Sequence, residues 1–236
     1  MIDVGVRLAL VRERMAEAAL RAGRRAEDVR LVAVSKTFPI DLIREAYAAG
    51  QRDFGENKVQ EALQKIEAGS DMQIGWHLIG HLQSNKARKA AGRVDWIHAV
   101  DSVDLLRRVD QAAVEAGRVV RVLVQVDLAL ESTKHGAPVD TVPDLLSAAR
   151  PLHGARLCGL MLLPPLTDNP EAARPWFRRL RELRDGWLDG GTPPECLQEL
   201  SMGMSHDFEV AIEEGATLVR VGSAVFGTRF YPAQGE

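Results

Sequence analysis

The sequence is short of the features that mark specialised classes of protein. Two cysteines, Cys158 and Cys196, occur among 236 residues, and neither has a second thiol at metal-ligand spacing. We therefore expect two buried free thiols and a reducing, cytoplasmic environment. Long apolar runs are also missing. Nothing approaches the roughly 20 residues that span a bilayer, and Arg7, Arg12 and Arg14 interrupt the N-terminal segment before it resembles a secretory signal.

An excess of positive charge is absent as well. The chain carries 30 Lys and Arg against 33 Asp and Glu, a net charge of −3, so neither nucleic acid nor an anionic membrane is an expected partner. A hydrophobic fraction of 46% and a charged fraction of 27% are those of an ordinary globular protein. Because no linker or low-complexity tract divides the chain, we expect one domain over residues 1–236.

Short runs rich in Val, Ile and Leu alternate with helical patterns, which predicts a parallel sheet whose strands are connected by helices. The eight predicted strands are residues 31–36, 53–56, 76–80, 96–100, 121–128, 157–162, 197–203 and 218–222. An extra N-terminal helix is predicted from an apolar stripe formed by Leu8, Val11, Met15 and Ala19. The expected fold is therefore an α/β protein, a single (β/α)8 TIM-type barrel with an extra N-terminal helix. A doubly wound sheet is less suitable because no G-x-G-x-x-G motif follows the first strand.

Two polar residues follow the first two strands at the end where such barrels build their sites. Lys36 ends the first strand, and Asn57 follows the second, where it is also predicted to cap a helix. An amine at Lys36 faces either the mouth of the barrel or solvent, and position alone leaves both open.

A phosphate site is predicted after the last two strands, a frequent location in these barrels. The residues that would form it are Ser201, Gly203, Met204, Ser205, Gly222 and Ser223. Glycines let the backbone approach an anion, and Ser205 is predicted at a helix N-terminus, where amide hydrogens are free. The alternative is that the glycines only make turns and that Ser205 only caps a helix.

Arg220 and two histidines have simpler explanations. Arg220 lies inside an apolar strand, so its guanidinium needs an acceptor, either in a rim salt bridge or on a bound ligand. His77 and His81 are four residues apart but span a strand and Gly80, so structural or rim roles are favoured over a metal site.

A resemblance to a known family extends over nearly the whole chain. The segments that carry it are LVAVSKTFP, FGENKVQEA, WHLIGHLQSNK, VQVDLALESTKHG, GLMLLPP and LSMGMSHDFEVAIEEGATLVRVGSAVFG. They resemble, in this order, the pyridoxal phosphate homeostasis protein family, whose barrel is similar to the N-terminal domain of alanine racemase.

The resemblance implies pyridoxal 5'-phosphate as cofactor, held by Lys36 as a Schiff base, with Asn57 near the ring. It also implies that Arg220 faces the pyridine nitrogen and that the phosphate is held by Ser201, Gly203, Met204, Ser205, Gly222 and Ser223. An arginine partner favours an unprotonated ring nitrogen, which weakens the cofactor as an electron sink.

The same resemblance implies a role in cofactor homeostasis rather than strong metabolic catalysis. Alanine racemase adds a second domain with a catalytic tyrosine, whereas this sequence ends at Glu236 and has only Tyr47 and Tyr231. We therefore expect a cytoplasmic, monomeric carrier, reservoir or regulator of pyridoxal phosphate with no catalytic residue and no metal. Apo-enzymes that use the cofactor would be its acceptors. The alternatives are a racemase or decarboxylase, or a colourless barrel enzyme that binds a phosphorylated substrate without this cofactor.

Overall fold

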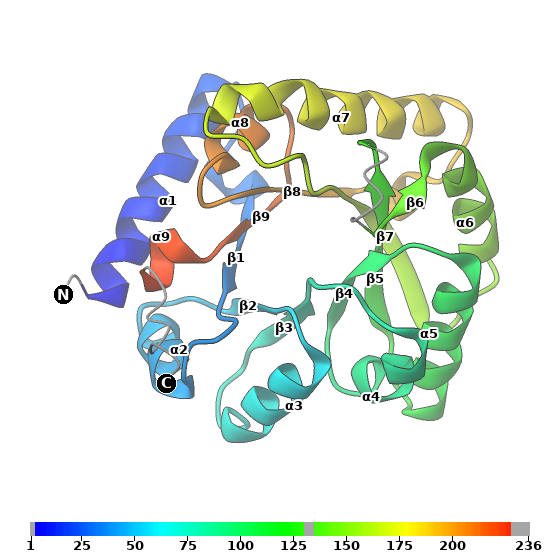
Figure 1. The fold of residues 1–236 in the computed structure, drawn as a ribbon, viewed down its shortest axis with the longest axis horizontal. Coiled ribbons are helices and arrows are strands. Elements are labelled where there is room, and N and C mark those ends of the chain that lie inside the picture. The colour runs from blue at the N-terminus through cyan, green and yellow to red at the C-terminus, as the bar shows by residue number, and fades with distance from the viewer. Residues whose placement is uncertain (1–2, 130–134, 228–236) are drawn as a thin grey trace, which may run out of the picture.

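The strands close into a parallel barrel surrounded by helices (Figure 1). The computed structural model describes residues 3–129 and 135–227. The barrel strands are β1 (Arg30–Val34), β2 (Asp53–Glu56), β3 (Gly75–Leu78), β4 (Trp96–Val100), β5 (Val120–Asp127), β7 (Ala155–Met161), β8 (Glu199–Met204) and β9 (Leu218–Val221). Pairing of β4 with β5 and of β9 with β1 closes the ring, and the short strand β6 (Ala137–Pro138) pairs in parallel with the end of β5. The predicted TIM-type barrel is confirmed, and each predicted strand coincides with one of these eight.

Helices pack around the outside of the ring. They are α1 (Val4–Arg21), α2 (Ile40–Ala48), α3 (Val59–Ala68), α4 (Ala87–Ala91), α5 (Val103–Glu115), α6 (Val142–Ala149), α7 (Arg174–Asp189), α8 (Phe208–Glu213) and α9 (Ser223–Phe226). Single 3-10 turns lie at Ala26–Asp28, Ser84–Lys86, Val139–Thr141, Pro170–Ala173 and Pro194–Cys196. Across the described part of the chain, no helix is long and apolar enough to cross a membrane.

The predicted N-terminal helix is α1, which lies against α8, α9 and α2 on the outside of the barrel (Figure 1). Asp3 caps it by accepting from the backbone N–H groups of Gly5 and Val6. The stripe that predicted this helix is buried as expected. Burial of that stripe fixes α1 to the barrel.

Successive side chains of β1 belong alternately to two different apolar cores. Leu31 and Ala33 belong to the large core between strands and helices, whereas Val32 belongs to a small cluster built from strand residues alone. Successive strand side chains point to opposite faces, so the small cluster is the interior of the barrel. Polar side chains also occupy that interior, as described below.

Two local predictions need correction. The residue at the N-cap of α3 is Lys58, without a side-chain bond, so Asn57 does not cap that helix. Cys196 is half-buried rather than buried, although both cysteines are free. The short helices α4 and α9 were not predicted, because each has too few residues for an apolar period. Ser102 caps α5, since its hydroxyl accepts from the N–H of Leu105.

Candidate functional site

The strand register brings Lys36 next to two other predicted site residues. Val34 pairs with Gly55 and Ala33 pairs with Val221. Two positions beyond Val34 and Gly55 are Lys36 and Asn57, at the carboxyl ends of neighbouring strands. On the other side, a Cβ added at Gly222 would lie 3.3 Å from the carbonyl oxygen of Val34. Lys36 follows the carboxyl end of β1 and is half-buried.

A buried ion pair fixes the backbone on both sides of Lys36. The Lys65 Nζ donates to the Ser35 carbonyl oxygen at 2.8 Å and to Oε1 of Glu56 and of Glu61 at 2.7 Å each. Glu61 Oε1 also accepts from the Thr37 N–H at 2.5 Å. Thr37 has a φ of 70°, a conformation that non-glycine residues rarely adopt. The ion pairs of Lys65 with Glu56 and Glu61 therefore fix the backbone of the turn that contains Lys36.

Glu56 is the most deeply buried member of this cluster. Its Oε1 also accepts from the Ser35 hydroxyl at 2.6 Å, whereas Oε2 has no partner among the described residues. Burial raises the pKa of Glu56, and the positive charge of Lys65 opposes that rise. The charged form of Glu56 thus depends on Lys65.

Two of the predicted phosphate residues, Ser205 after β8 and Gly222 after β9, are in contact, whereas Ser201 lies deeper, in the barrel interior beside Arg220. The Ser205 Oγ accepts from the N–H of Gly222 at 3.0 Å and of Ala224 at 3.4 Å. Ser205 was predicted at a helix N-terminus, which is wrong for its own helix: Asp207 occupies the N-cap of α8, and its carboxylate accepts from the Met204 N–H at 2.6 Å. The Ser205 hydroxyl instead accepts from backbone N–H groups at the start of α9, so it lies beside the predicted phosphate residues Gly222 and Ser223.

Gly203 is required by the backbone at this place. Its φ is 93°, and an added Cβ would lie 2.6 Å from the Cβ of Ala211. The glycine therefore lets β8 turn tightly over α8. Ser223 is exposed at the start of α9, and Met204 is half-buried beside Ser205.

Arg220 points into the barrel interior. It is 3% exposed, and its guanidinium donates to the Ser201 Oγ at 2.6 Å and to the Leu162 carbonyl oxygen at 2.9 Å. Burial lowers the pKa of Arg220 to about 10, and the charge of Asp207 opposes that shift. No ion pair of Arg220 is found among the described residues, so the rim salt bridge, one of the two possibilities that the sequence left open, is not formed there. The guanidinium stays charged and has donors to offer.

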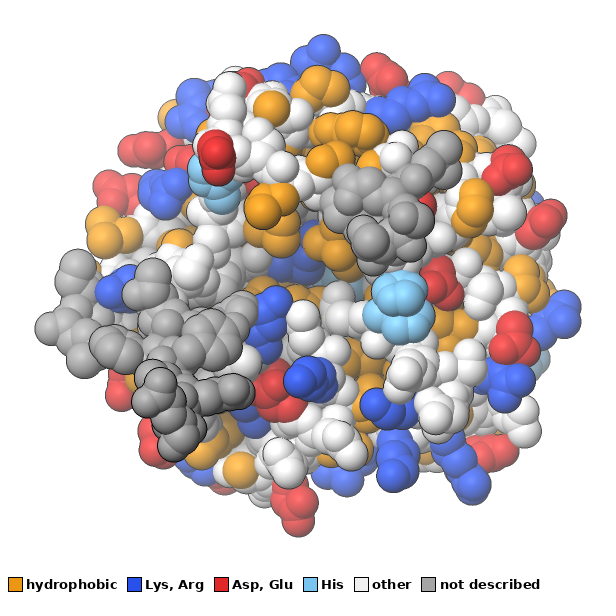
Figure 2. All heavy atoms as spheres, viewed as in Figure 1, with side chains coloured by type: hydrophobic (Ala, Val, Ile, Leu, Met, Phe, Trp, Pro, Cys, Tyr) orange, Lys and Arg blue, Asp and Glu red, His pale blue; other side chains and the backbone are white. Residues whose placement is uncertain are grey.

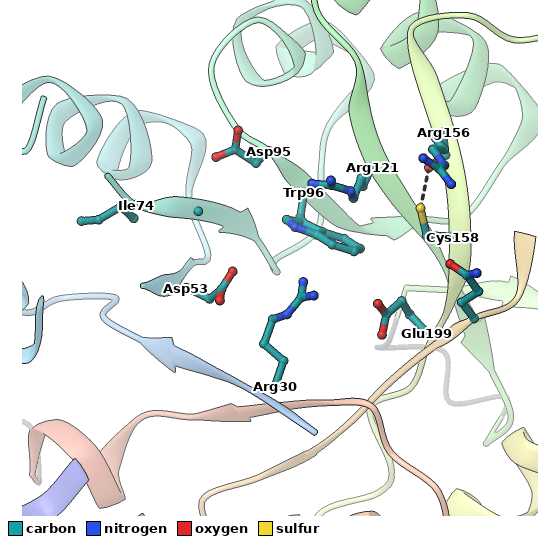
Figure 3. A pocket seen from close by; sticks show the side chains of 11 residues that line it. Arg30, Asp53, Ile74, Asp95, Trp96, Arg121, Arg156, Cys158 and Glu199 are labelled. Atoms are coloured by element: carbon teal, nitrogen blue, oxygen red, sulfur yellow. Dashed lines mark hydrogen bonds between the residues drawn. The ribbon is translucent and has the colours of Figure 1, made fainter. Parts of the chain in front are cut away.

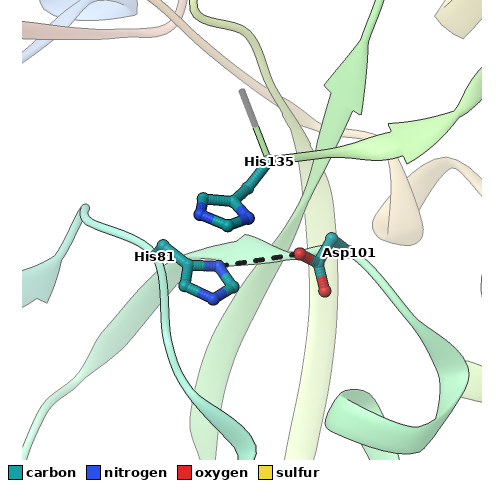
Figure 4. A group of neighbouring side chains, drawn as sticks. All are labelled: His81, Asp101 and His135. Carbon is teal, nitrogen blue, oxygen red and sulfur yellow. Dashed lines mark ion pairs between the residues drawn. The ribbon is translucent and has the colours of Figure 1, made fainter. Parts of the chain in front are cut away.

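Two histidines and an aspartate lie together at the rim of the carboxyl end of the barrel. His81 and His135 stack with ring centroids 3.6 Å apart and planes 11° apart, and His81 Nδ1 lies 3.7 Å from Asp101 Oδ2 (Figure 4). Burial, followed by the charge of His135, lowers the pKa of His81. Nitrogen lone pairs lie in the ring plane, so two nearly parallel rings cannot aim at one metal ion as they stand. The rim role predicted for His81 fits this arrangement, whereas His77 lies in the barrel interior.

The face of the barrel seen in Figure 2 is hollowed at its centre, where Lys or Arg side chains lie among hydrophobic ones. A half-buried amine, a charged buried guanidinium and a hydroxyl with two backbone donors therefore share the carboxyl end of the barrel. These groups suit a small ligand that carries a phosphate and a carbonyl group.

Comparison with known proteins agrees with this arrangement. Residues 7–230 match the family model described as alanine racemase, N-terminal domain. The chain is 44% identical to the pyridoxal phosphate homeostasis protein of Aquifex aeolicus, over 95% of this chain and 98% of that protein.

Solved structures give the same result. PipY of Synechococcus elongatus, 42% identical, has been solved without PLP and with PLP bound. The TM-score is 0.85 without PLP, over 95% of this chain and 100% of PipY, and 0.78 with PLP, over 92% and 100%. An alanine racemase of Clostridium difficile, 14% identical with a TM-score of 0.74 over 98% of this chain and 58% of that one, shares the fold alone.

Proposed function

The chain belongs to the pyridoxal phosphate homeostasis protein family, and from this premise we propose that it binds pyridoxal 5'-phosphate reversibly and acts in the homeostasis of the free cofactor. The observation that carries the proposal is that Lys36, Arg220 and the Ser205 hydroxyl lie toward the same end of the barrel. An amine, a ring partner and a phosphate site are the three groups that this cofactor needs.

Each group of the cofactor has a partner in this proposal. Lys36 would hold the aldehyde carbon covalently, and Asn57, one strand along, would lie near the ring. Ser205, Gly222 and Ser223 would hold the phosphate, with Ser201, Gly203 and Met204 shaping the strand beneath it. Arg220 would face the ring nitrogen.

Pyridoxal phosphate supplies an aldehyde that bonds reversibly to amines and a ring that withdraws electrons most strongly when its nitrogen is protonated. The Arg220 guanidinium is positively charged and only donates hydrogen bonds, so it opposes protonation of a nitrogen placed beside it. The residues of this chain therefore favour storage and exchange of the cofactor over catalysis that removes a proton from bound amino acids.

A racemase is the main alternative, and the placement of Tyr47 disfavours it. Tyr47 lies on α2 outside the barrel, where its hydroxyl accepts from the Gln73 N–H and its ring lies under Arg52. Tyr231 lies outside the described residues. Tyr47 is therefore not placed to move a proton at the barrel mouth.

The covalent attachment is tested by reduction and mapping. We expect borohydride to fix one cofactor per chain on Lys36 and Lys36→Ala to remove the yellow absorption. Lys58→Ala is the matched control, because Lys58 is exposed one residue beyond Asn57. An adduct on another lysine would reject the assignment. A colourless protein that still binds phosphate would favour the alternative of a barrel enzyme that binds a phosphorylated substrate without this cofactor.

The storage role is tested by hydrogen exchange. Incubating the cofactor-loaded protein with L-alanine in deuterated water should give negligible deuterium at the α carbon and no D-alanine, while an added apo-enzyme slowly gains activity. If Arg220 is the cause, Arg220→Glu should raise the exchange rate. Rapid exchange by the unaltered protein would establish the racemase instead.

We extend the proposal to the setting of the protein. The free thiols of Cys158 and Cys196 favour a reducing cytoplasm. We propose that residues 1–236 act as one cofactor-binding domain, monomeric in solution, and that its acceptors are apo-enzymes. Size-exclusion chromatography with light scattering measures the first property, and activation of an apo-enzyme measures the second.

A further inference from the structure

A line of hydrogen bonds crosses the interior of the barrel behind Arg220. Arg220 Nη1 lies 2.6 Å from Ser201 Oγ, which lies 2.9 Å from His98 Nδ1. His98 Nε2 lies 2.9 Å from His77 Nδ1, and His77 Nε2 lies 2.9 Å from Asp53 Oδ1. Five side chains from β9, β8, β4, β3 and β2 thus form one continuous chain of polar contacts.

This line of hydrogen bonds is buried except at its Asp53 end. His77, His98, Ser201 and Arg220 are each at most 3% exposed, whereas the Asp53 side chain is 25% exposed. Asp53 lines a polar pocket of about 500 Å³ at the amino ends of the strands, where Arg30 and Trp96 also lie (Figure 3). The line of hydrogen bonds therefore runs from this pocket to Arg220 at the candidate cofactor site.

The two ends of the chain determine the direction of every hydrogen bond in it. A carboxylate only accepts, so His77 Nε2 carries a proton, and a guanidinium only donates, so Ser201 accepts from Arg220. Burial lowers the pKa of His77 and, more strongly, that of His98, which keeps both rings neutral. A neutral His77 then accepts at Nδ1 from His98 Nε2–H. His98 Nδ1, left without a proton, accepts from the Ser201 hydroxyl.

We propose that Asp53, His77 and His98 are positioning residues that fix Arg220 through Ser201, with all hydrogen bonds donated in one direction, from Arg220 toward Asp53. The Ser201 proton is held by His98, so the lone pairs of Ser201 are turned toward Arg220. Hydrogen bonds that point the same way polarise one another, and the Asp53 carboxylate thereby favours the charged guanidinium across the barrel. Trp96 stacks on His77 with planes 6° apart and centroids 5.4 Å apart, which fixes the orientation of that ring.

Part of this inference rests on the proposed function, namely that Arg220 faces the cofactor ring, but the chain itself is tested without cofactor. In the apo-protein, nitrogen-15 NMR of the histidine side chains should show His77 and His98 both neutral with the proton on Nε2. Exposed His153 is the internal reference for a ring without a fixed tautomer. A proton on Nδ1 of either buried ring, or a doubly protonated ring at neutral pH, would overturn the proposal.

Two substitutions at Asp53 separate the hydrogen bond from the charge. Asp53→Asn keeps an acceptor for His77, so both tautomers should stay as they are. Asp53→Ala removes the acceptor, so the chain can reverse and both His77 and His98 should become mixtures of tautomers, although Asp53 contacts only His77. A change confined to His77 would show that no ordered chain exists.

Cofactor binding gives the second measurement. Asp53→Ala should weaken pyridoxal phosphate binding by about three- to tenfold and shift its absorption maximum, while Asp53→Asn should retain most of the affinity. Thermal unfolding of the two variants controls for a general loss of structure. Equal affinity and absorption in the alanine and asparagine variants would refute the link to Arg220. Absence of cofactor binding by the unaltered protein would instead refute the proposed function and leave the NMR result standing.

Discussion

Removal of Lys65 tests whether the buried ion pair behind Lys36 supports both the fold and the site. The Lys65 side chain is 9% exposed and contacts a Glu56 side chain that is fully buried, at 2.7 Å. Lys65→Met keeps the aliphatic stem and removes the charge, so Glu56 loses its cation. Lys58→Met is the matched control, because Lys58 is exposed at the start of the same helix.

The expected loss of stability is large. Breaking a buried ion pair by removing one partner costs about 3–5 kcal/mol, because the other charge stays buried and unpaired. A typical domain is stable by roughly 5–15 kcal/mol, so the variant should lose a large fraction of the free energy of unfolding. Adding Glu56→Gln to Lys65→Met should restore most of the loss, since the buried charge is then gone as well.

The pH dependence identifies the charge as the cause. A carboxyl group whose pKa is raised by folding binds its proton more readily in the native state, so it destabilises the protein above its folded pKa and less as the pH falls. The pKa of Glu56 is raised by burial even with Lys65 present, and it should rise further without it. The difference in stability between the unaltered protein and Lys65→Met should therefore shrink as the pH is lowered.

Urea unfolding followed by circular dichroism measures these differences, and borohydride labelling of Lys36 reports the site. Lys65→Met should label Lys36 more slowly, because the Ser35 and Thr37 backbone loses its support. A loss below about 1 kcal/mol, the usual value for an exposed pair, would refute the reasoning, as would a double variant no more stable than Lys65→Met.

Two further perturbations test the predicted phosphate site and the ion pairs of Glu214, which is 4% exposed. Ser205→Ala should weaken pyridoxal phosphate by about 1.5–3 kcal/mol, the value of a hydrogen bond to a charged group. Titration with pyridoxal, which lacks the phosphate, should show no such loss, and equal losses would contradict a phosphate role. Burial alone would raise the pKa of Glu214, but hydrogen bonds from Arg178 and Arg174 outweigh it and lower that pKa. The stability that Glu214 contributes is therefore present above its unfolded pKa of about 4.3 and is lost as the pH falls further. In Glu214→Gln, the urea concentration at the unfolding midpoint should therefore depend less on pH between neutral and acidic conditions.

The barrel could be predicted from sequence because its signal is local. Each strand is a run of apolar residues that fits the buried parallel strands of a barrel, and the stripe of α1 repeats over several turns. The helix α4 gave no such signal, because five residues, three of them alanine, are too few to show a period. Short elements of this kind are set by the contacts around them.

The caps show where local rules compete. Asn57 and Ser205 are both good capping residues, yet Lys58 and Asp207 occupy the N-cap positions. Asp207 lies two residues after Ser205 and has a carboxylate that accepts from the Met204 N–H. Ser205 is thereby left to contact the backbone that follows β9, at the start of α9, and this contact forms only when the barrel closes.

The polar chain behind Arg220 had no sequence signal, for a physical reason. Its members come from five strands, and each one alone is ordinary: His77 and His98 lie in separate apolar runs, and Asp53 begins a third. What joins them is closure of the ring, which places the third residues of β3, β4, β8 and β9 in the interior together. A buried arginine in a strand does predict that an acceptor must exist. Following that acceptor from Ser201 through two rings to Asp53 needs the register of every strand between them, because a shift of one residue would turn each of these side chains out of the barrel.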